Sequence, residues 1–258
     1  ELDGQLSQIK NKKQLEKHLK SWEQDSSQSA IGFILSLEGA DSIVSMNHLH
    51  LMYQEGLRAV GPAHYGPGTY AFGTNSNGGI GRKGKELLNE IASLQIILDT
   101  THLCDQSFWE TMEIFDGSVW ASHSNVRKRV PNERQFNNDQ IKVLIERDAI
   151  IGMAFDAWMM IPDWKRGISD PKTIGLNLEK IVNHIDDICQ LAGNTDHVMI
   201  GSDLDGGFGK EQCPFDLETI SDLQKLNSIF SKRGYNESDI EKIFSKNGIR
   251  FLMKNLPD

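Results

Sequence analysis

The chain has 258 residues, of which 38% are hydrophobic and 24% are charged, and its formal net charge at pH 7 is -9. This length is that of one α/β barrel or of two smaller domains, and it is enough to bury a sizeable core. The acidic balance argues against general nucleic-acid binding, which requires a basic face, and no apolar run reaches the roughly 18 residues of a membrane-spanning helix.

Strands and helices alternate in the first part of the chain. A charged helix is predicted over residues 12–22. The nearly continuous apolar run over residues 31–37 predicts a strand that is buried on both faces. The predicted elements that follow are a helix over 43–55, a strand over 57–61, a long loop over 65–81, a helix over 84–93 and a strand over 94–98.

The same alternation continues in the second part. Between the predicted strands 94–98 and 118–121, Phe108, Met112 and Phe115 have the spacing of one face of a helix. A strand, a helix and a strand in this order form a βαβ unit, which needs a parallel sheet. No repeat, low-complexity tract or linker interrupts the chain, so we expect residues 1–258 to form one domain. The remaining predicted elements are a helix over 138–147, a strand over 149–155, a loop over 158–173, a helix over 176–191, a strand over 197–201, and two or three helices in the tail, one beginning at Ser238.

Each predicted strand is followed by a polar residue that can bind a metal ion or take part in catalysis. A doubly wound sheet concentrates such residues near one switch point, whereas a barrel collects them from strands all round its ring. The pattern therefore favours the α/β class and, within it, a (β/α)8 barrel of the TIM type. The residues at or just after the strand ends are Glu38, His64, Asp99, His102, His123, Asp156 and Asp203.

Three of these residues have the side chains of a hydrolytic zinc site. Glu38, His102 and His123 offer a carboxylate and two imidazoles, and a carboxylate can also bridge two metal ions. The alternative is that they make ordinary hydrogen bonds at the strand ends. His184 lies on the apolar face of a predicted helix, so we expect it to be satisfied in the core or to support a ligand rather than to bind a metal. Arg134, in the loop after His123, is placed to bind a carboxylate with its planar fork.

A glycine motif and the cysteines narrow the range of functions. Residues 79–84 fit G-x-G-x-x-G but follow a loop rather than a strand, so the dinucleotide interpretation fails.

Three cysteines without C-x-x-C spacing argue against a disulfide framework and favour a reducing compartment. The start ELDGQLSQIKNKKQ is too polar for a signal peptide, although a secreted protein whose signal had been removed would look the same. We expect a soluble, cytoplasmic protein, with a periplasmic or secreted one as the alternative.

A series of longer motifs is more specific than any single residue. The series consists of SLEGADSI, GLRAVGPAHYGPG, ILDTTHLCD, VWASHSN, the loop of Arg134, LEKIVNHIDDICQLAG and HVMIGSDLDGGFG. In order and spacing, from about residue 30 onward, it resembles the membrane (renal) dipeptidase family of binuclear zinc peptidases. The AHYGPG segment at His64 is most similar to the bacterial branch of that family.

The resemblance implies an amidohydrolase-type (β/α)8 barrel and a set of metal ligands. Glu38 matches the carboxylate that bridges both zinc ions, and His102 and His123 match the two histidines that complete the second zinc site. A complete active site of this family holds two zinc ions. The family also implies a homodimer. Animal relatives are lipid-anchored through an apolar C-terminal tail, whereas this chain ends in FLMKNLPD.

The resemblance also implies a reaction, the hydrolysis of a dipeptide by a metal-activated hydroxide. His64 matches the histidine that contacts the substrate and supports the tetrahedral intermediate. Arg134 matches the arginine that binds the terminal carboxylate of the substrate. Asp203 matches the acidic residue that handles the amino group and the proton transfer. Gln135 stands where animal members typically have Asn, which bears on substrate preference and not on the reaction.

One large departure concerns the ligands of the first zinc ion. In the family these are a His-x-Asp pair at the end of the first strand, whereas the only His-x-Asp here is His184-Ile185-Asp186, inside a predicted helix. The six predicted strands match the third to the eighth of the family barrel. We therefore expect that an N-terminal segment with the first two strands and these ligands is missing from the sequence.

Two functions other than that of a dipeptidase remain open from the sequence. The first is another amidohydrolase-type metal hydrolase, acting on an N-acyl amino acid or a lactone. The second is an inactive fragment that binds a metal or a small ligand without turnover, which the missing His-x-Asp strand favours for the chain taken alone.

Overall fold

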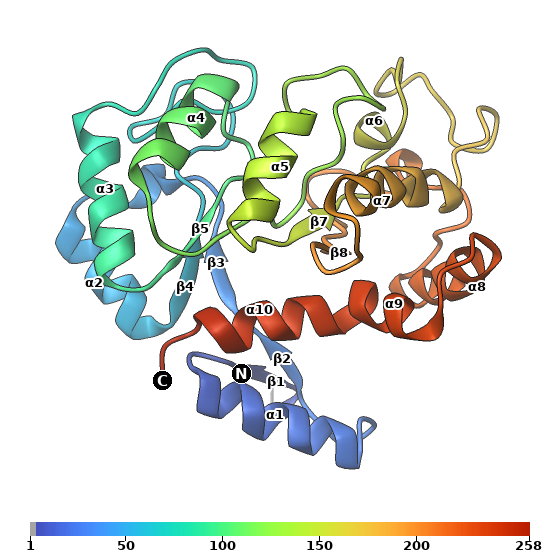
Figure 1. Ribbon diagram of the computed structural model, residues 1–258, viewed down its shortest axis with the longest axis horizontal. Coiled ribbons are helices and arrows are strands. Elements are labelled where there is room, and N and C mark those ends of the chain that lie inside the picture. The colour runs from blue at the N-terminus through green and yellow to red at the C-terminus, as the bar shows by residue number, and fades with distance from the viewer. Residues whose placement is uncertain (1–3) are drawn as a thin grey trace. The chain divides into compact units, whose positions relative to one another are not determined.

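The computed structural model describes residues 4–258 (Figure 1). The described residues form two compact units. Unit 1 comprises residues 4–120 together with Arg250–Asp258, and unit 2 comprises Ala121–Ile249. Each unit combines helices with short parallel strands, which agrees with the predicted fold class. That residues 1–258 form one domain stays a prediction.

Unit 1 is built on parallel strands covered by helices. Strands β1 (Leu6–Gln8) and β2 (Ile31–Phe33) pair with each other. A separate four-stranded sheet has the order β3 (Leu35–Leu37), β4 (Leu57–Val60), β5 (Ile97–Asp99) and β6 (Val119–Trp120), all parallel. The helices of unit 1 are α1 (Lys12–Gln24), the 3-10 turn Ala40–Ser42, α2 (Met46–Glu55), α3 (Arg82–Ser93), α4 (Asp105–Ile114) and the end of α10 (Asn247–Asn255).

Local signals set the ends of these helices. The Asn11 side chain accepts a hydrogen bond from the backbone N–H of Gln14 at the start of α1, and Ser45 caps α2 in the same way. Gly56 ends α2 with a φ of 108°, in the left-handed region that glycine tolerates. Helix α3 buries Leu87, Leu88 and Ile91, so its apolar face supplies the core of unit 1.

The strand over residues 31–37 differs from its prediction in two ways. It divides into β2 and β3, and β2 pairs with β1, a strand that the sequence analysis did not predict. It is also not buried on both faces, because Ile31 is 61% exposed and Leu35 is 39% exposed. Ile34, on the opposite face, packs against a cluster that contains Ile9 and Leu15. One face of the strand is therefore partly buried and the other is exposed, and the expectation of two buried faces was wrong.

Unit 2 contains a smaller parallel pair and most of the C-terminal helices. Strands β7 (Ile151–Met153) and β8 (Val198–Ile200) are parallel, and Ala121 bridges to Ile151. A Cβ atom at Gly152 would lie 2.0 Å from the carbonyl oxygen of Ser122, so only glycine allows the backbones to approach this closely. The helices are α5 (Asn138–Glu146), α6 (Ala157–Met160), α7 (Glu179–Ala192), the 3-10 turns Lys210–Gln212 and Ile220–Gln224, α8 (Lys225–Lys232), α9 (Glu237–Glu241), the π-helical turn Lys242–Lys246 and the start of α10.

The helices of unit 2 begin with side-chain caps. Asn137 and Gln140 form a capping box at the start of α5. Helix α9 begins at Glu237 with Asn236 as its cap, close to the start predicted at Ser238. Asn247, at the start of α10, is buried and its side-chain amide donates to the carbonyl oxygens of Thr195 (2.7 Å) and Val198 (2.8 Å). This amide ties α10 to the start of β8.

Replacing Asn247 by alanine should lower the free energy of unfolding by about 2–4 kcal/mol, because two buried carbonyl groups lose their donor. Urea-induced unfolding followed by circular dichroism measures this change. Asn227→Ala is the matched control, since Asn227 is exposed on α8, and its effect should stay within about 0.5 kcal/mol. Equal effects in the two variants would contradict the role given to the Asn247 amide.

Candidate metal centre

The candidate centre depends on the βαβ unit formed by β5, α4 and β6. The two strands are parallel, with Leu98 opposite Val119 and Asp99 opposite Trp120. His102 and His123 each stand three residues after the end of their strand. Both histidines therefore follow neighbouring strands at the carboxyl edge of the sheet, where parallel α/β proteins bind their ligands. The predicted strand–helix–strand order is confirmed.

His102 is buried and held in a fixed orientation. Its Nδ1 atom lies 3.0 Å from the hydroxyl of Thr74, and its Nε2 atom lies 3.0 Å from Oε1 of Glu38. Its φ of 69° is in the left-handed region, which non-glycine residues occupy mainly where the surrounding structure holds them. An imidazole whose Nδ1 is bonded to an oxygen and whose Nε2 faces a carboxylate has the arrangement of a metal-binding histidine.

Glu38 and His64 follow the adjacent strands β3 and β4. Their side chains are about half exposed, and Nε2 of His64 lies 4.0 Å from Oε1 of Glu38. The ring centres of His64 and His102 are 4.4 Å apart. Gly39 lets the chain turn after Glu38, because its φ is 78° and a Cβ there would lie 3.2 Å from Cβ of His64. Unit 1 thus brings together three predicted site residues.

His123 and Asp203 form the corresponding pair in unit 2. Nδ1 of His123 is 2.8 Å from the hydroxyl of Ser122, and its Nε2 is 3.8 Å from Oδ1 of Asp203. Asp203 follows β8 and has a φ of 58°, again in the left-handed region. The Ser122 hydroxyl plays the part that Thr74 plays for His102. Both imidazoles therefore present Nε2 toward a carboxylate, which fits a site for a zinc ion.

Arg134 lies against the backbone of His123. Its guanidinium is buried and donates to the Ser124 hydroxyl (2.8 Å) and to the carbonyl oxygen of His123 (3.0 Å). Gln135 is also buried, and it accepts from the backbone N–H of Asn125 and donates to the carbonyl oxygen of Met159. The glutamine at this position is thus a brace between backbone segments.

Thr74 and Gln212 bond to residues that follow the strands, and neither was predicted from the sequence. Thr74 lies in the long loop predicted over residues 65–81, and it is buried. Gln212 donates a hydrogen bond to Asp156, which is buried just after β7 and is one of the predicted strand-end residues. Burial raises the pKa of Asp156, while the hydrogen bond from Gln212 opposes that shift. No sequence motif links Thr74 to His102 or Gln212 to Asp156, because each pair comes together only when the chain folds.

His184 is a satisfied core residue, as predicted. The backbone N–H of Val126 donates to its Nδ1 (3.1 Å), so its Nε2 carries the hydrogen and donates to the carbonyl oxygen of Met160 (3.0 Å). The sequence His184-Ile185-Asp186 lies inside α7 and not at the end of a strand. It therefore does not correspond to the strand-end His-x-Asp pair that the family resemblance implies.

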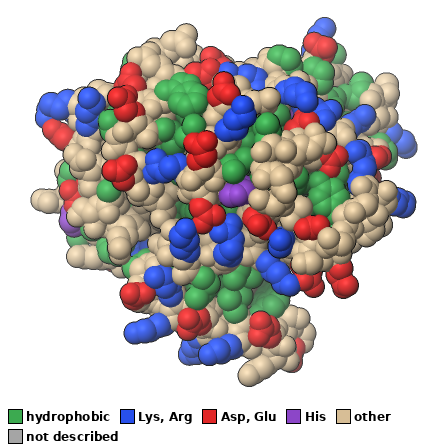
Figure 2. Space-filling model, in the orientation of Figure 1, with side chains coloured by type: hydrophobic (Ala, Val, Ile, Leu, Met, Phe, Trp, Pro, Cys, Tyr) green, Lys and Arg blue, Asp and Glu red, His purple; other side chains and the backbone are tan. Residues whose placement is uncertain are grey.

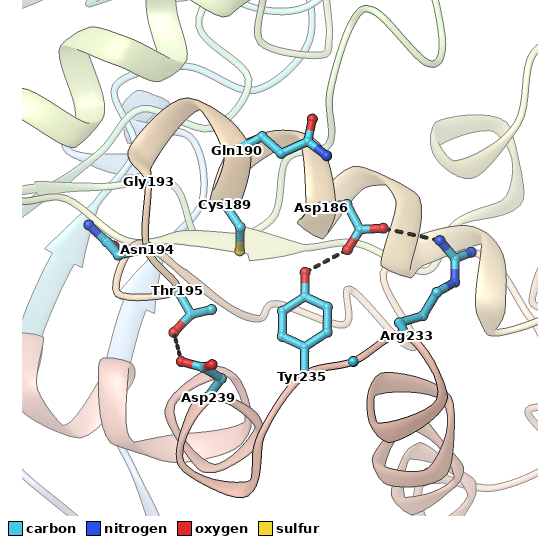
Figure 3. A pocket seen from close by; sticks show the side chains of 10 residues that line it. Asp186, Cys189, Gln190, Gly193, Asn194, Thr195, Arg233, Tyr235 and Asp239 are labelled. Atoms are coloured by element: carbon cyan, nitrogen blue, oxygen red, sulfur yellow. Dashed lines mark hydrogen bonds and ion pairs between the residues drawn. The ribbon is translucent and has the colours of Figure 1, made fainter.

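Other features of the surface lie apart from the predicted site residues. A pocket of about 410 Å³ lies at the end of α7 in unit 2, and Figure 3 shows Tyr235 and Arg233 bonded to Asp186 there. Figure 2 shows acidic and basic side chains interspersed on the visible face. Among residues 4–258, no helix has both the length and the apolar character needed to cross a lipid bilayer.

Comparison with known proteins identifies the family. Residues 5–255 match the sequence model of the membrane dipeptidases, peptidase family M19, so the chain belongs to that family. The family that the motifs indicated is confirmed. Its members are metallopeptidases, which are hydrolases, and membership therefore assigns the chain to a family of metal-dependent enzymes.

Individual relatives are distant in sequence. An uncharacterized protein in the pqqA 5′ region of Klebsiella pneumoniae is 25% identical over 233 residues, which are 86% of this chain and 81% of that protein. Dipeptidase tcpJ of Claviceps purpurea is 24% identical over 232 residues, which are 86% of this chain and 51% of that protein. The chain thus spans about half the length of the Claviceps enzyme.

A solved structure shows the fold. It is a metallo peptidase from Rhodobacter sphaeroides liganded with a phosphinate mimic of the dipeptide L-Ala-D-Ala. The TM-score is 0.84 at 23% identity, and the alignment covers 99% of this chain and 70% of that one. This likeness supports the predicted α/β fold. Among the described residues, the strands form three separate groups rather than one closed sheet.

The buried imidazole of His184 should make stability depend on pH. Burial lowers its pKa from 6.5 to about 4, so at intermediate pH the unfolded chain binds a proton that the folded chain does not. The neutral imidazole therefore contributes its full stabilisation above pH 6.5, and this stabilisation is lost as the pH falls toward 4. Between about pH 7.5 and about pH 5, the free energy of unfolding should fall by about 2 kcal/mol through this residue.

Urea unfolding at both pH values measures the effect. His184→Gln keeps a donor and an acceptor but does not titrate, so its loss of stability between the two pH values should be smaller by that amount. The same loss in both proteins would show that His184 is not the titrating group.

Proposed function

We propose that the protein is a zinc-dependent dipeptidase in which Glu38, His102 and His123 hold a zinc ion. The main support is the 3.0 Å approach of His102 Nε2 to Glu38, with the opposite ring nitrogen fixed by Thr74. His123 follows the neighbouring parallel strand and is oriented in the same way by Ser122. A bound zinc ion would act as a Lewis acid toward the peptide carbonyl and would lower the pKa of water.

Glu38 is suited to a site with a second ion. Its carboxylate has two oxygens, and it lies near both His102 and His64. In a complete active site Glu38 would help to hold two zinc ions, as the family resemblance implies. His64, which is half exposed, would then contact the substrate and stabilise negative charge on its carbonyl oxygen.

Asp203 and Arg134 would hold the two ends of a dipeptide. The Asp203 carboxylate, beside His123, can bind the ammonium group and pass a proton to the leaving amine. The Arg134 guanidinium, fixed against the carbonyl of His123, provides the positive charge for the terminal carboxylate. Recognition of both charged ends would restrict the substrate to two residues. We also propose a homodimer, on the family resemblance, and light scattering of the purified protein would test it. The cysteine content favours a cytoplasmic location.

Loss of a ligand should remove both the metal and the activity. His102→Ala and His123→Ala should lower zinc affinity by more than about 100-fold, beyond the usual effect of removing an outer partner. Elemental analysis gives the zinc content, and release of free amino acids from dipeptides gives the activity. A chelator should abolish hydrolysis by the wild type, and added zinc should restore it.

His50→Ala is the matched control, because His50 is exposed on α2 and pairs with Glu90. It should keep the zinc and the activity of the wild type. Hydrolysis of lactones or N-acyl amino acids without dipeptide hydrolysis would favour another amidohydrolase-type reaction. Zinc binding without turnover of any of these substrates would favour an inactive metal-binding protein.

The role of Arg134 can be tested by pairing a variant with a modified substrate. For the wild type, a dipeptide whose terminal carboxylate is amidated should show a kcat/KM at least about 10-fold lower than the free dipeptide, because it lacks the charge that Arg134 binds. In Arg134→Gln, kcat/KM for the free dipeptide should fall to about that for the amidated dipeptide, whose own kcat/KM should change little. An undiminished preference for the free dipeptide in the variant would show that another group binds the carboxylate.

A further inference from the structure

A closed loop carries Asp203 in unit 2. At its start, the backbone N–H of Phe155 donates to the carbonyl oxygen of Ser202 (2.9 Å). At its end, the side-chain amide of Gln212 donates to Oδ1 of Asp156 (2.7 Å). Phe155 and Asp156 are consecutive residues just after β7, so one short segment fastens both ends of residues 203–212.

Two partners fix the orientation of the Gln212 side-chain amide. Gln212 is 3% exposed and Asp156 is 4% exposed. The Gln212 amide oxygen accepts a hydrogen bond from Nε of Arg166 (3.0 Å), so its NH₂ group must face Asp156. Arg166 also places a guanidinium nitrogen 3.9 Å from the other Asp156 oxygen. The three side chains therefore join β7, the loop over residues 158–173 and the loop of Asp203.

The loop between the two fastenings is tightly turned. The N–H of Gly206 donates to the carbonyl oxygen of Asp203, and the N–H of Gln212 donates to that of Gly209, both at 3.0 Å. Asp203 itself occupies the left-handed region, with a φ of 58°, which few residues other than glycine adopt. A backbone held there needs support from elsewhere in the structure.

We infer that Gln212 is a positioning residue that holds the Asp203 carboxylate beside His123, with Asp156 and Arg166 as its anchors. This inference rests on the proposed function of Asp203 in dipeptide hydrolysis. The burial of the Asp156 carboxylate supports it, because a buried charge adds little net stability and is often kept for a specific arrangement. Gln212 touches neither the substrate nor the reacting atoms in this scheme. It acts only through the loop.

Gln212→Met removes the amide but keeps the length of the side chain. It should lower kcat for dipeptides by about 10–100-fold, the usual effect of losing a partner that orients a site, while zinc content stays unchanged. Hydrogen exchange of the Gly206 and Gln212 amides should become faster than in the wild type. Gln190→Met, on α7 and outside the loop, is the matched control and should change neither quantity.

Gln212→Glu is a second variant, and its readout is the dependence of activity on pH, which a general loss of stability would not change. When protonated, the new carboxyl group can still donate to Asp156, and when ionised it repels that carboxylate. Arg166 and Asp156 are the charged groups that face it. Activity of this variant should therefore approach that of the wild type at low pH and fall relative to it as the pH rises.

The outcomes separate the inference from the proposed function. Wild-type kcat, exchange rates and pH profile in both Gln212 variants would overturn the inference. A parallel fall in thermal stability and zinc content, with no faster exchange in residues 203–212, would also overturn it. If the wild type hydrolyses no dipeptide, the proposed function fails, and the exchange rates alone decide whether Gln212 fastens the loop.

Discussion

The parallel pairing of β5 and β6 is the constraint on which the candidate site depends. Parallel neighbours cannot be joined by a tight turn, so the chain crosses over through α4 and returns to the same edge. The strands are only two or three residues long, but their residues are buried and paired in register. His102 and His123 therefore start from fixed backbone positions, and each needs only a short loop to reach the carboxyl edge.

Each imidazole is then oriented by a neutral hydroxyl. Thr74 and Ser122 bond to the Nδ1 atoms of His102 and His123, which leaves the Nε2 atoms facing carboxylates. A neutral partner fixes the ring without adding a second negative charge near Glu38. The left-handed backbone of His102 adds strain at this point, and such strain persists only where neighbouring contacts hold it.

Regular patterns in the sequence predicted the strands and the residues after them, but not the contacts that complete the site. The mostly apolar segments that became β4, β5, β6 and β7 are buried, and β8 begins at the buried Val198, so the positions of these strands follow from the chain itself. Strand β1 contains one apolar residue, Leu6, and is only half-buried, so it has no such run. Thr74 and Gln212 reach their partners across 28 and 56 residues of sequence, and no local pattern records that distance.

Buried neutral amides support several loops of unit 2, beside charged groups such as Arg134 and Asp156. Asn125 accepts from and donates to the backbone of Ala154, Gln135 joins Asn125 to Met159, and Gln212 holds Asp156. An amide both donates and accepts, so a single buried side chain can satisfy two separate segments and fix the direction of each bond. A charged side chain in these positions would carry a large desolvation cost and would need its own partner. The amides of Asn125 and Gln135 therefore connect backbone segments of unit 2 without placing a further charge in its interior.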